Sequence, residues 1–418
     1  MATDHGKLRI DGGRLLDRLT SLSEIGAIAG TTGSSRLAFT DADRDGRDLV
    51  VTWMSDLGLE VTVDGIGNVV GLWVPDGVDP SLAPVMTGSH IDTVRTGGRY
   101  DGNLGVLAGL EVIETLVTAG VAPTRPMAVG FFSNEEGARF PPDMMGSLVY
   151  VGGLGLEEAH AVQGIDGATV GDELDRIGYR GSAPCPGLAP HSFVELHIEQ
   201  GPVLEEQGIQ IGVVETVQGI SWTEITIDGQ SNHAGTTPMR LRHDAGYVAA
   251  AITTFVRELA VELGHPQVAT VGAIDLHPNL VNVVAATAQL TVDLRNTDNR
   301  QLIEAEKRLS GRLDELSESE GVAISTRTLA RFDPVEFDRE VVDLVEQTAQ
   351  RLGSTTLRMP SGAGHDAQMM ARICPTAMIF TPSRNGISHN PAEHTDPGDL
   401  EAGSNVLLQV LLALASRS

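Results

Sequence analysis

Short apolar runs bounded by glycine, proline or asparagine recur along the chain, and they restrict the folds that it can adopt. A run of this length is typical of a strand buried on both faces of a parallel sheet. Between two of the runs, residues 104–117 carry leucine, isoleucine and valine at helical spacing. Alternating strands and helices predict an α/β domain. The apolar runs are residues 68–74, 85–87, 127–132, 193–198 and, near the C-terminus, 376–380.

The stretch from about residue 211 to residue 327 has a different pattern. Strands are predicted at 221–227, 268–274, 288–294 and 322–326, with helices at 245–263 and 302–316. The order of strand, helix, two strands, helix and strand is that of a ferredoxin-like module. The predicted buried faces of the two helices are Ala245, Val248, Ala249, Ile252, Phe255, Val256, Leu259 and Leu263, and Leu302, Ala305, Leu309, Leu313 and Leu316.

These two patterns predict a small α+β domain inserted into a larger α/β domain. We expect the larger domain to comprise residues 1–211 and 329–418 and the insertion to comprise residues 212–328. A length of 418 residues is ample for two domains, since one domain takes ~100–200 residues.

Charge and cysteine content narrow the range of partners and compartments. Lysine and arginine total 29 against 56 for aspartate and glutamate, a net charge of -27, which disfavours nucleic acid and anionic membranes as partners. Residues 1–13 lack the apolar segment of a signal peptide, and the apolar stretch 406–415 is too short to cross a bilayer. Two cysteines, Cys185 and Cys374, provide no disulfide framework. We therefore expect a cytoplasmic protein with neither a nucleic acid nor a membrane partner.

The first segment with candidate metal-binding residues follows the strand predicted at 85–87. His90 is followed by Asp92, and an imidazole can bind a metal ion while a neighbouring carboxylate orients its ring. Asp101 stands just before the helix predicted at 104–117. Because aspartate is also a preferred helix cap, Asp101 is either a ligand or only a cap.

Two adjacent carboxylates, Glu135 and Glu136, follow the strand predicted at 127–132. Adjacent carboxylates repel each other unless a cation neutralises one of them. Because consecutive residues do not easily ligate the same ion, one glutamate is a candidate ligand and the other a candidate base. The alternative is a solvated acidic turn.

Two further histidines complete the candidate set. His197 lies within the strand predicted at 193–198, and His389 lies in a loop of glycine, asparagine and proline. Either histidine alone would be read as structural. Three histidines with several carboxylates form a mixed nitrogen and oxygen set suited to Zn²⁺, Mn²⁺ or Co²⁺.

Longer motifs around these residues resemble those of a known family, the dinuclear metallo-amidohydrolases related to aminoacylases. Within it, the chain is most similar to the N-carbamoyl-L-amino-acid hydrolases, with the allantoate amidohydrolases and β-ureidopropionases close by. The motifs that carry the resemblance are Gly88-Ser89-His90-Ile91-Asp92-Thr93, Gly98-Arg99-Tyr100-Asp101-Gly102, Asn134-Glu135-Glu136-Gly137-Ala138-Arg139-Phe140, His197-Ile198-Glu199-Gln200-Gly201-Pro202, Asn232-His233-Ala234-Gly235-Thr236-Thr237-Pro238-Met239 and Ser361-Gly362-Ala363-Gly364-His365-Asp366-Ala367.

The resemblance implies a fold and a set of roles. The fold is a zinc-peptidase-like α/β catalytic domain with an inserted ferredoxin-like lid and dimerisation domain. Two divalent metal ions are implied, Zn²⁺ first, with Mn²⁺, Co²⁺ or Ni²⁺ as alternatives. The implied site roles are Asp101 as bridging ligand, His90 and His197 at one metal, Glu136 and His389 at the other, Glu135 as general base, and Asp92 and Gln200 as supporting residues.

The resemblance also assigns residues that handle the substrate. His233 would donate to the oxyanion, across a homodimer formed through the lid domain, while Asn282, Arg295 and Gly364 would bind the substrate. The implied substrate is a small ureido acid, and the implied reaction releases an L-amino acid, CO₂ and ammonia. Members that use allantoate tend to carry basic residues where this chain has residues 219–222, which favours N-carbamoyl-L-amino acids. Allantoate amidohydrolase, β-ureidopropionase and a non-catalytic homologue remain the alternatives.

Overall fold

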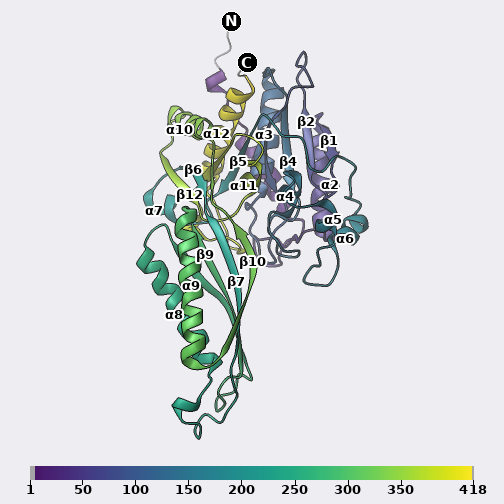
Figure 1. Cartoon of the computed structure of the whole chain (residues 1–418). Coiled ribbons are helices and arrows are strands. Elements are labelled where there is room, and N and C mark those ends of the chain that lie inside the picture. Colours follow the sequence, from purple (N-terminus) through teal and green to yellow (C-terminus); the bar gives the residue numbers. More distant parts are fainter. Residues whose placement is uncertain (1–4, 417–418) are drawn as a thin grey trace. The chain divides into compact units, whose positions relative to one another are not determined.

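A computed structural model describes residues 5–416, and its backbone contacts divide the chain into two compact units (Figure 1). Unit 2 is Thr216–Val335, and unit 1 comprises the residues before and after it. The sequence placed these boundaries after residues 211 and 328, which is four and seven residues early. The reason is strand pairing: β6 (Ile211–Val217) pairs with a unit 1 strand, and β10 (Ala323–Phe332) pairs along its full length within unit 2.

Unit 1 contains a nine-stranded sheet whose centre is parallel. Its order is β1-β2-β4-β3-β5-β13-β6-β11, with β12 paired to β6. Every residue of the central strands β3, β4, β5 and β13 is buried, which agrees with the continuous apolar runs of their sequences. The strand bounds are β1 Glu60–Val63, β2 Val69–Trp73, β3 Val85–His90, β4 Met127–Phe132, β5 Ser192–Ile198, β11 Val335–Glu336, β12 Thr356–Ser361 and β13 Thr376–Thr381.

Helices cover this sheet. The predicted α3 (Asn103–Ala119) packs on β3 and β5, and the C-terminal α12 (Pro397–Ala415) packs on β13 and on α3. The other helices of unit 1 are α1 Gly12–Ser23, α2 Asp41–Asp56, α4 Met145–Tyr150, α5 Leu156–His160, α6 Val170–Ile177, α7 Val203–Gln207, α10 Arg339–Arg351 and α11 Asp366–Met370, with 3-10 turns at His5–Lys7 and Arg384–Gly386.

Unit 2 has the predicted element order. Its antiparallel sheet has the order β10-β7-β9-β8, and α8 and α9 pack on it around an apolar core (Figure 1). The predicted buried faces are confirmed, except that Phe255 and Leu263 are only partly buried. The bounds are β7 Gly219–Asp228, α8 Ala245–Leu263, β8 Val268–His277, β9 Thr287–Asn296, α9 Asn299–Glu320 and a 3-10 turn at Met239–Leu241.

The fold bears on the predicted fold class and on the presence of membrane-spanning helices. The α/β class with an inserted α+β module is confirmed in the element order of the two units. In the part of the chain that the structure describes, no helix is both long enough and apolar enough to cross a membrane.

Candidate metal centre

The candidate ligands gather where neighbouring parallel strands end. Strand β3 lies between β4 and β5 and is parallel to both, with His90 opposite Phe132 and Thr87 opposite Val194. Continuing the second register places His90 level with His197 on β5. The acidic segment that follows Phe132 leaves β4 at the same edge. Parallel strands thus bring together three segments that are far apart in the sequence.

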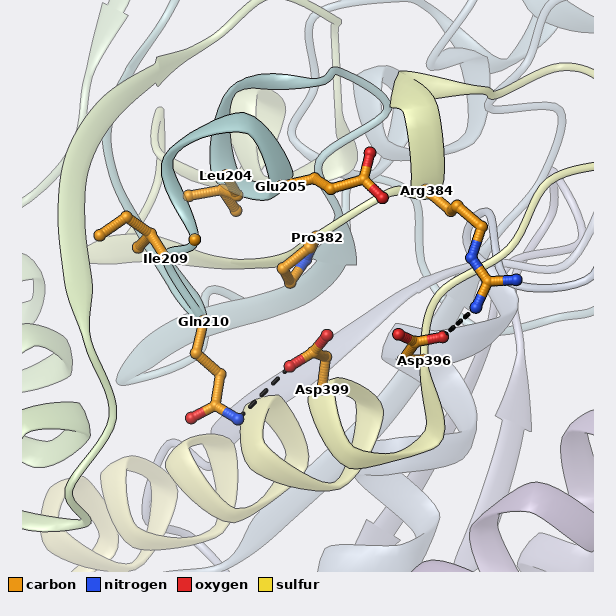
Figure 2. A pocket seen from close by; sticks show the side chains of 9 residues that line it. Leu204, Glu205, Ile209, Gln210, Pro382, Arg384, Asp396 and Asp399 are labelled. Atoms are coloured by element: carbon orange, nitrogen blue, oxygen red, sulfur yellow. Dashed lines mark hydrogen bonds and ion pairs between the residues drawn. The ribbon is translucent and has the colours of Figure 1, made fainter.

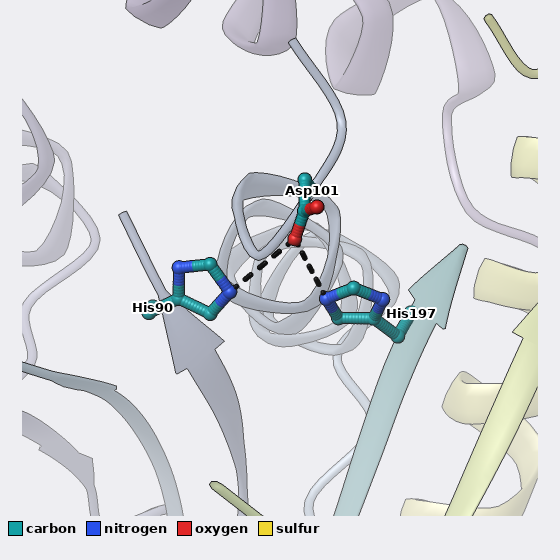
Figure 3. A group of neighbouring side chains, drawn as sticks. All are labelled: His90, Asp101 and His197. Atoms are coloured by element: carbon teal, nitrogen blue, oxygen red, sulfur yellow. Dashed lines mark ion pairs between the residues drawn. The ribbon is translucent and has the colours of Figure 1, made fainter. Parts of the chain in front are cut away.

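Asp101, in the turn before α3, lies between the two histidines (Figure 3). Its Oδ1 is 3.4 Å from Nε2 of His90 and 3.2 Å from Nε2 of His197. Each of the three residues is at most 4% exposed. The three side chains form a buried nitrogen and oxygen set that could hold a metal ion.

The tautomers of the two histidines favour a cation at this position. Nδ1 of His90 lies 2.9 Å from the carbonyl oxygen of Asp92, and Nδ1 of His197 lies 2.8 Å from that of Ile198. Because a carbonyl oxygen only accepts, Nδ1 carries the proton in both rings. The Nε2 lone pair of His90 then faces Oδ1 of Asp101, and that of His197 lies near Oδ1 while it also accepts the N–H of Gly102 at 3.1 Å. A cation bound among Nε2 of the two rings and Oδ1 makes this arrangement favourable.

The charges around the centre also favour a bound cation. Burial lowers the pKa of His90, but the carboxylates of Glu135, Asp101 and Asp92 outweigh it and raise that pKa well above its ordinary value. Burial alone would raise the pKa of Asp101, yet its contacts with His197 and His90 hold it well below its ordinary value. The pocket therefore attracts positive charge.

A second donor set uses the other oxygen of Asp101. Nε2 of His389 lies 3.5 Å from Oδ2 of Asp101 and 3.2 Å from Oε2 of Glu136. These three residues form another group that could hold a metal ion, and the His389 side chain is 52% exposed. His389 itself adopts a φ of 53°, in the left-handed region that non-glycine residues adopt less often than glycine. Asp101 thus turns one carboxylate oxygen toward each donor set.

Glu135 lies beside the first donor set without belonging to either group. Its Oε2 is 3.4 Å from Nε2 of His90, and the side chain is only 8% exposed. Burial raises the pKa of Glu135 well above its ordinary value, and the nearby carboxylates of Asp366, Glu136 and Asp101 raise it further. A carboxylate with a raised pKa is suited to accept a proton and pass it on.

Asp92 supports the centre in a way that the sequence did not predict. Its carboxylate was expected to orient the ring of His90, but the backbone carbonyl of Asp92 does so, and the carboxylate stays 4.0 Å from Nδ1. The carboxylate instead accepts the backbone N–H groups of Glu135 (3.2 Å) and Glu136 (3.3 Å). Asp92 therefore joins the end of β3 to the acidic segment after β4.

Gln200 and two residues that the sequence did not single out hold Asp101. Nε2 of Gln200 (2.8 Å) and Oγ of Ser388 (3.1 Å) donate to Oδ2 of Asp101. The buried carboxylate of Glu393 accepts the backbone N–H of Tyr100 (2.9 Å) and that of Asp101 (3.2 Å). The only sequence signal for Ser388 and Glu393 is their place in the loop that carries His389.

Glu195 is a further buried carboxylate that the sequence left unassigned. With His197 and His365 it forms a third group of donor atoms close enough to hold an ion. However, its oxygens accept Oγ–H of Ser89 (2.6 Å) and the backbone N–H of Ala367 (2.8 Å). Glu195 thereby fastens β5 to β3 and to the start of α11.

His233 and Asn282, two of the predicted substrate residues, are neighbours within unit 2. The segment of His233 pairs with Val283, and the N–H of Ala234 donates to the carbonyl oxygen of Asn282. Nδ1 of His233 accepts the backbone N–H groups of Gly235 (3.0 Å) and Thr236 (3.2 Å). The proton of this imidazole is therefore on Nε2, which makes that nitrogen a donor.

Arg295 lies on β9 of unit 2, where its guanidinium donates to the carboxylate of Asp293 at 2.9–3.1 Å. The guanidinium carbon also lies 5.9 Å from the ring centre of Trp222. Ile220, opposite Arg295 in the β7–β9 register, is buried at 1% exposure, so Trp222 is the more exposed apolar side chain of residues 219–222.

Gly364 belongs to unit 1 and lies in the loop before α11. A Cβ at this position would come within 2.8 Å of the Met144 side chain. The backbone N–H of Met144 in turn donates to the carbonyl of Glu135 at 2.6 Å. Gly364 thus packs against the residue that supports the acidic segment.

Elsewhere in unit 1, a pocket of about 360 Å³ lies between α7, α12 and the 382–384 segment (Figure 2). Its polar groups bind each other: Arg384 pairs with Asp396, and Gln210 donates to Asp399 at 3.3 Å. Among the described residues that line this pocket, none belongs to a group of donors that could hold a metal ion.

Comparison with known proteins identifies similar chains. Residues 86–413 match the model of peptidase family M20/M25/M40. An N-carbamoyl-L-amino-acid amidohydrolase of Rhizobium meliloti is 40% identical over 99% of both chains. An allantoate amidohydrolase of Escherichia coli is 37% identical over 92% of this chain and 93% of its own. A ureidoglycolate hydrolase of Arabidopsis thaliana is 33% identical over 96% of this chain and 85% of its own.

A solved structure agrees with these sequence comparisons. An amidase of the hydantoinase/carbamoylase family from Burkholderia multivorans superposes with a TM-score of 0.91. It is 42% identical, over 98% of this chain and 99% of its own. The resemblance noted in the sequence motifs is therefore confirmed over nearly the whole chain.

Proposed function

The chain belongs to peptidase family M20/M25/M40, and we propose that it hydrolyses N-carbamoyl-L-amino acids to the L-amino acid, CO₂ and ammonia. It is a hydrolase of carbon–nitrogen bonds in linear amides, as its relatives are by name. The observation that carries the proposal is the position of Asp101, whose two carboxylate oxygens face two separate donor sets. This arrangement is suited to a pair of metal ions that share one carboxylate.

The donor chemistry fits two divalent cations, with Zn²⁺ first and Mn²⁺, Co²⁺ or Ni²⁺ as alternatives. His90, Asp101 and His197 would hold one ion, and Asp101, Glu136 and His389 would hold the other. When bound, such ions polarise a carbonyl group and lower the pKa of water from 15.7 toward ~7.

The residues of unit 1 would then perform the proton transfers. Glu135 takes a proton from the attacking water as this oxygen bonds to the ureido carbon. The same carboxyl group delivers the proton to the amino acid nitrogen as the bond from carbon to that nitrogen breaks. The carbamic acid that leaves decomposes to CO₂ and ammonia, so that one water is consumed for each substrate.

Residues of unit 2 would bind the substrate and stabilise its oxyanion. We propose that Nε2–H of His233 donates to the oxyanion and that Arg295 and Asn282 bind the carboxylate, with Gly364 of unit 1 allowing a close approach of the backbone. The backbone pairing of the His233 and Asn282 segments supports a shared task. Arg295 would exchange Asp293 for the substrate carboxylate, a competition between two carboxylates for one guanidinium.

We further propose a cytoplasmic homodimer in which His233 serves the active site of the partner subunit. The edge strand β8 supports dimerisation through unit 2, because it is unpaired on one side and exposes Val268, Ile274 and Leu276. The free cysteines, Cys185 and Cys374, support a reducing compartment.

The choice of substrate rests on residues 219–222, which form the start of β7. Allantoate has a second ureido group that needs polar partners, and Trp222 provides few of them. We therefore expect N-carbamoyl-L-amino acids with apolar side chains to have the highest kcat/KM. Allantoate and N-carbamoyl-β-alanine remain the alternatives from the sequence, and ureidoglycolate joins them because of the relatives of that name. A non-catalytic homologue is disfavoured by the presence of Glu135 beside the first donor set.

The test is a panel of ureido acids assayed with defined metal content. N-carbamoyl-L-methionine, its D enantiomer, N-carbamoyl-β-alanine, allantoate and ureidoglycolate are compared by kcat/KM, and the metal is measured by elemental analysis. We expect the L-methionine derivative to be the best substrate and a chelator to abolish activity. Preference for another substrate overturns the substrate assignment, and full activity in metal-free protein overturns the metal assignment.

A further inference from the structure

Arg36 is a fully buried arginine, and among the residues that the structure describes it forms no ion pair, although the charges of Asp43 and Asp92 act on its pKa from a longer distance. Within the described residues, its guanidinium donates only to neutral acceptors: the carbonyl oxygens of Leu22, Ile25 and Ile91 and the side-chain oxygen of Asn103. The other fully buried arginine, Arg47, has a carboxylate partner in Asp43 at 2.8 Å. A buried charge without an ion pair is costly, so its retention calls for a functional explanation.

The guanidinium of Arg36 connects two segments that carry metal-ligand candidates. Its Nε donates to the carbonyl of Ile91 at 2.7 Å, and Ile91 stands between His90 and Asp92 in the sequence. One terminal nitrogen donates to Oδ1 of Asn103 at 2.8 Å, two residues after Asp101. One planar group therefore spans the end of β3 and the turn before α3.

Further contacts hold the end of β3 to Arg36 and close the turn before α3. The backbone N–H of Arg36 donates to Oγ1 of Thr93 (2.8 Å), and the N–H of Thr93 donates to the carbonyl of Arg36 (2.9 Å). The side-chain amide of Asn103 donates to the carbonyl of Arg99 at 3.2 Å, which closes the turn around Asp101. Movement of the guanidinium would thus be transmitted to both segments.

Gly46 of α2 leaves room for the side chain of Arg36. A Cβ at Gly46 of α2 would lie 2.8 Å from Cδ of Arg36, so a larger residue there would displace the arginine stem. The guanidinium nitrogens are fixed in one plane at fixed separations, unlike the single nitrogen of lysine. Only such a fork can hold two acceptors at a set distance.

We infer that Arg36 is a positioning residue of the metal centre, which sets the distance between His90 and Asp101 through Ile91 and Asn103. The inference rests on the proposed metal-dependent function. Neither ligand candidate is touched by the guanidinium itself, so the effect of Arg36 is on geometry. Residues that orient metal ligands typically contribute ~10–100-fold to metal affinity.

The experiment measures metal binding by Arg36→Lys, Arg36→Met, Asn103→Ala and the double variant Arg36→Met/Asn103→Ala. Zn²⁺ affinity is determined by competition with a chromophoric chelator, and the visible spectrum of Co²⁺-loaded protein reports coordination geometry. Unfolding of the metal-free proteins reports the fold. We expect each single variant to lose ~10–100-fold in affinity with an altered Co²⁺ spectrum. The double variant should lose little more than Arg36→Met, because both changes break one connection.

The matched control is Arg18→Lys, at a largely buried arginine that pairs with Glu111 and Glu114 in the middle of α3, away from both segments. It should lower the stability of the metal-free protein and leave Zn²⁺ affinity unchanged. Full affinity in Arg36→Lys would show that charge alone suffices and would overturn the positioning role. An affinity loss in Arg18→Lys that matches its loss of stability would overturn it as well. If Arg36→Met does not fold, Asn103→Ala decides the question. Absence of metal binding in the wild-type chain would overturn the proposed function itself.

Discussion

At the scale of single residues, the chemistry depends on which atoms face one another. Asp101 turns Oδ1 toward His90 and His197 and Oδ2 toward His389. The backbone carbonyls that receive Nδ1–H of His90 and His197 determine that their Nε2 lone pairs face the metal position. Glu135 and Glu136 are adjacent in sequence, yet only Glu136 belongs to a donor set. This difference predicts different phenotypes for two otherwise identical substitutions.

We expect Glu135→Gln to keep both metal ions and to lose ~10²–10⁴-fold in kcat, because the amide cannot accept the water proton. Glu136→Gln serves as its matched control and should lose metal from the His389 set, since a neutral amide is a weaker ligand. The metal content of both purified variants is measured by elemental analysis, and their kcat is measured by a turnover assay. Equal metal loss in the two variants would contradict the assigned division of roles.

At the scale of secondary structure elements, the start of α3 is constrained by its contact with the metal centre. Gly102 has a φ of +66°, and a Cβ there would lie 2.4–2.5 Å from atoms of the His90 ring. Its N–H donates to Nε2 of His197 at 3.1 Å. The turn that presents Asp101 therefore requires glycine for both its backbone conformation and its packing. Gly120, at the other end of the same helix, has a φ of +64°, and a Cβ there would meet no atom within 4 Å.

These two glycines provide a matched pair of substitutions. Gly120→Ala should cost ~1–2 kcal/mol of stability through its backbone conformation alone and keep the metal ions. Gly102→Ala should also displace the His90 ring and lower metal affinity by ~10–100-fold. Thermal unfolding and chelator competition distinguish the two effects. Wild-type metal affinity in folded Gly102→Ala would show that the turn and ring adapt.

At the scale of the whole molecule, the candidate residues are divided between the two units. Both donor sets and Glu135 belong to unit 1, whereas His233, Asn282 and Arg295 belong to unit 2. Each unit has its own sheet, and unit 2 has a separate core formed by α8, α9 and the inner face of its sheet. A catalyst assembled from both units requires either closure within one chain or a contribution from a second chain, and we have proposed the second.

Subunit complementation tests this proposal. His233→Ala and Glu135→Gln chains are each expected to be inactive, and mixing them should restore about a quarter of wild-type activity, because half of the dimers are mixed and each has one complete site. The measurement is activity after subunit exchange verified with a labelled chain. Each variant exchanged with itself is the control. No recovery in verified mixed dimers would show that the site is built within one chain.

The sequence by itself determined the types of element and the segments that carry the ligands. Apolar runs and helical spacing are local patterns, so the central strands, α3 and the buried faces of α8 and α9 were predictable. Polar residues directly after strands in a parallel sheet converge at one edge, so the ligand segments were predictable too. Tertiary structure alone decided the partners of each atom. Arg36 meets Ile91 and Asn103, and Glu393 meets the backbone of Asp101, across separations of 55, 67 and 292 residues. Such contacts leave no local periodicity in the sequence, because they arise only when distant segments pack together.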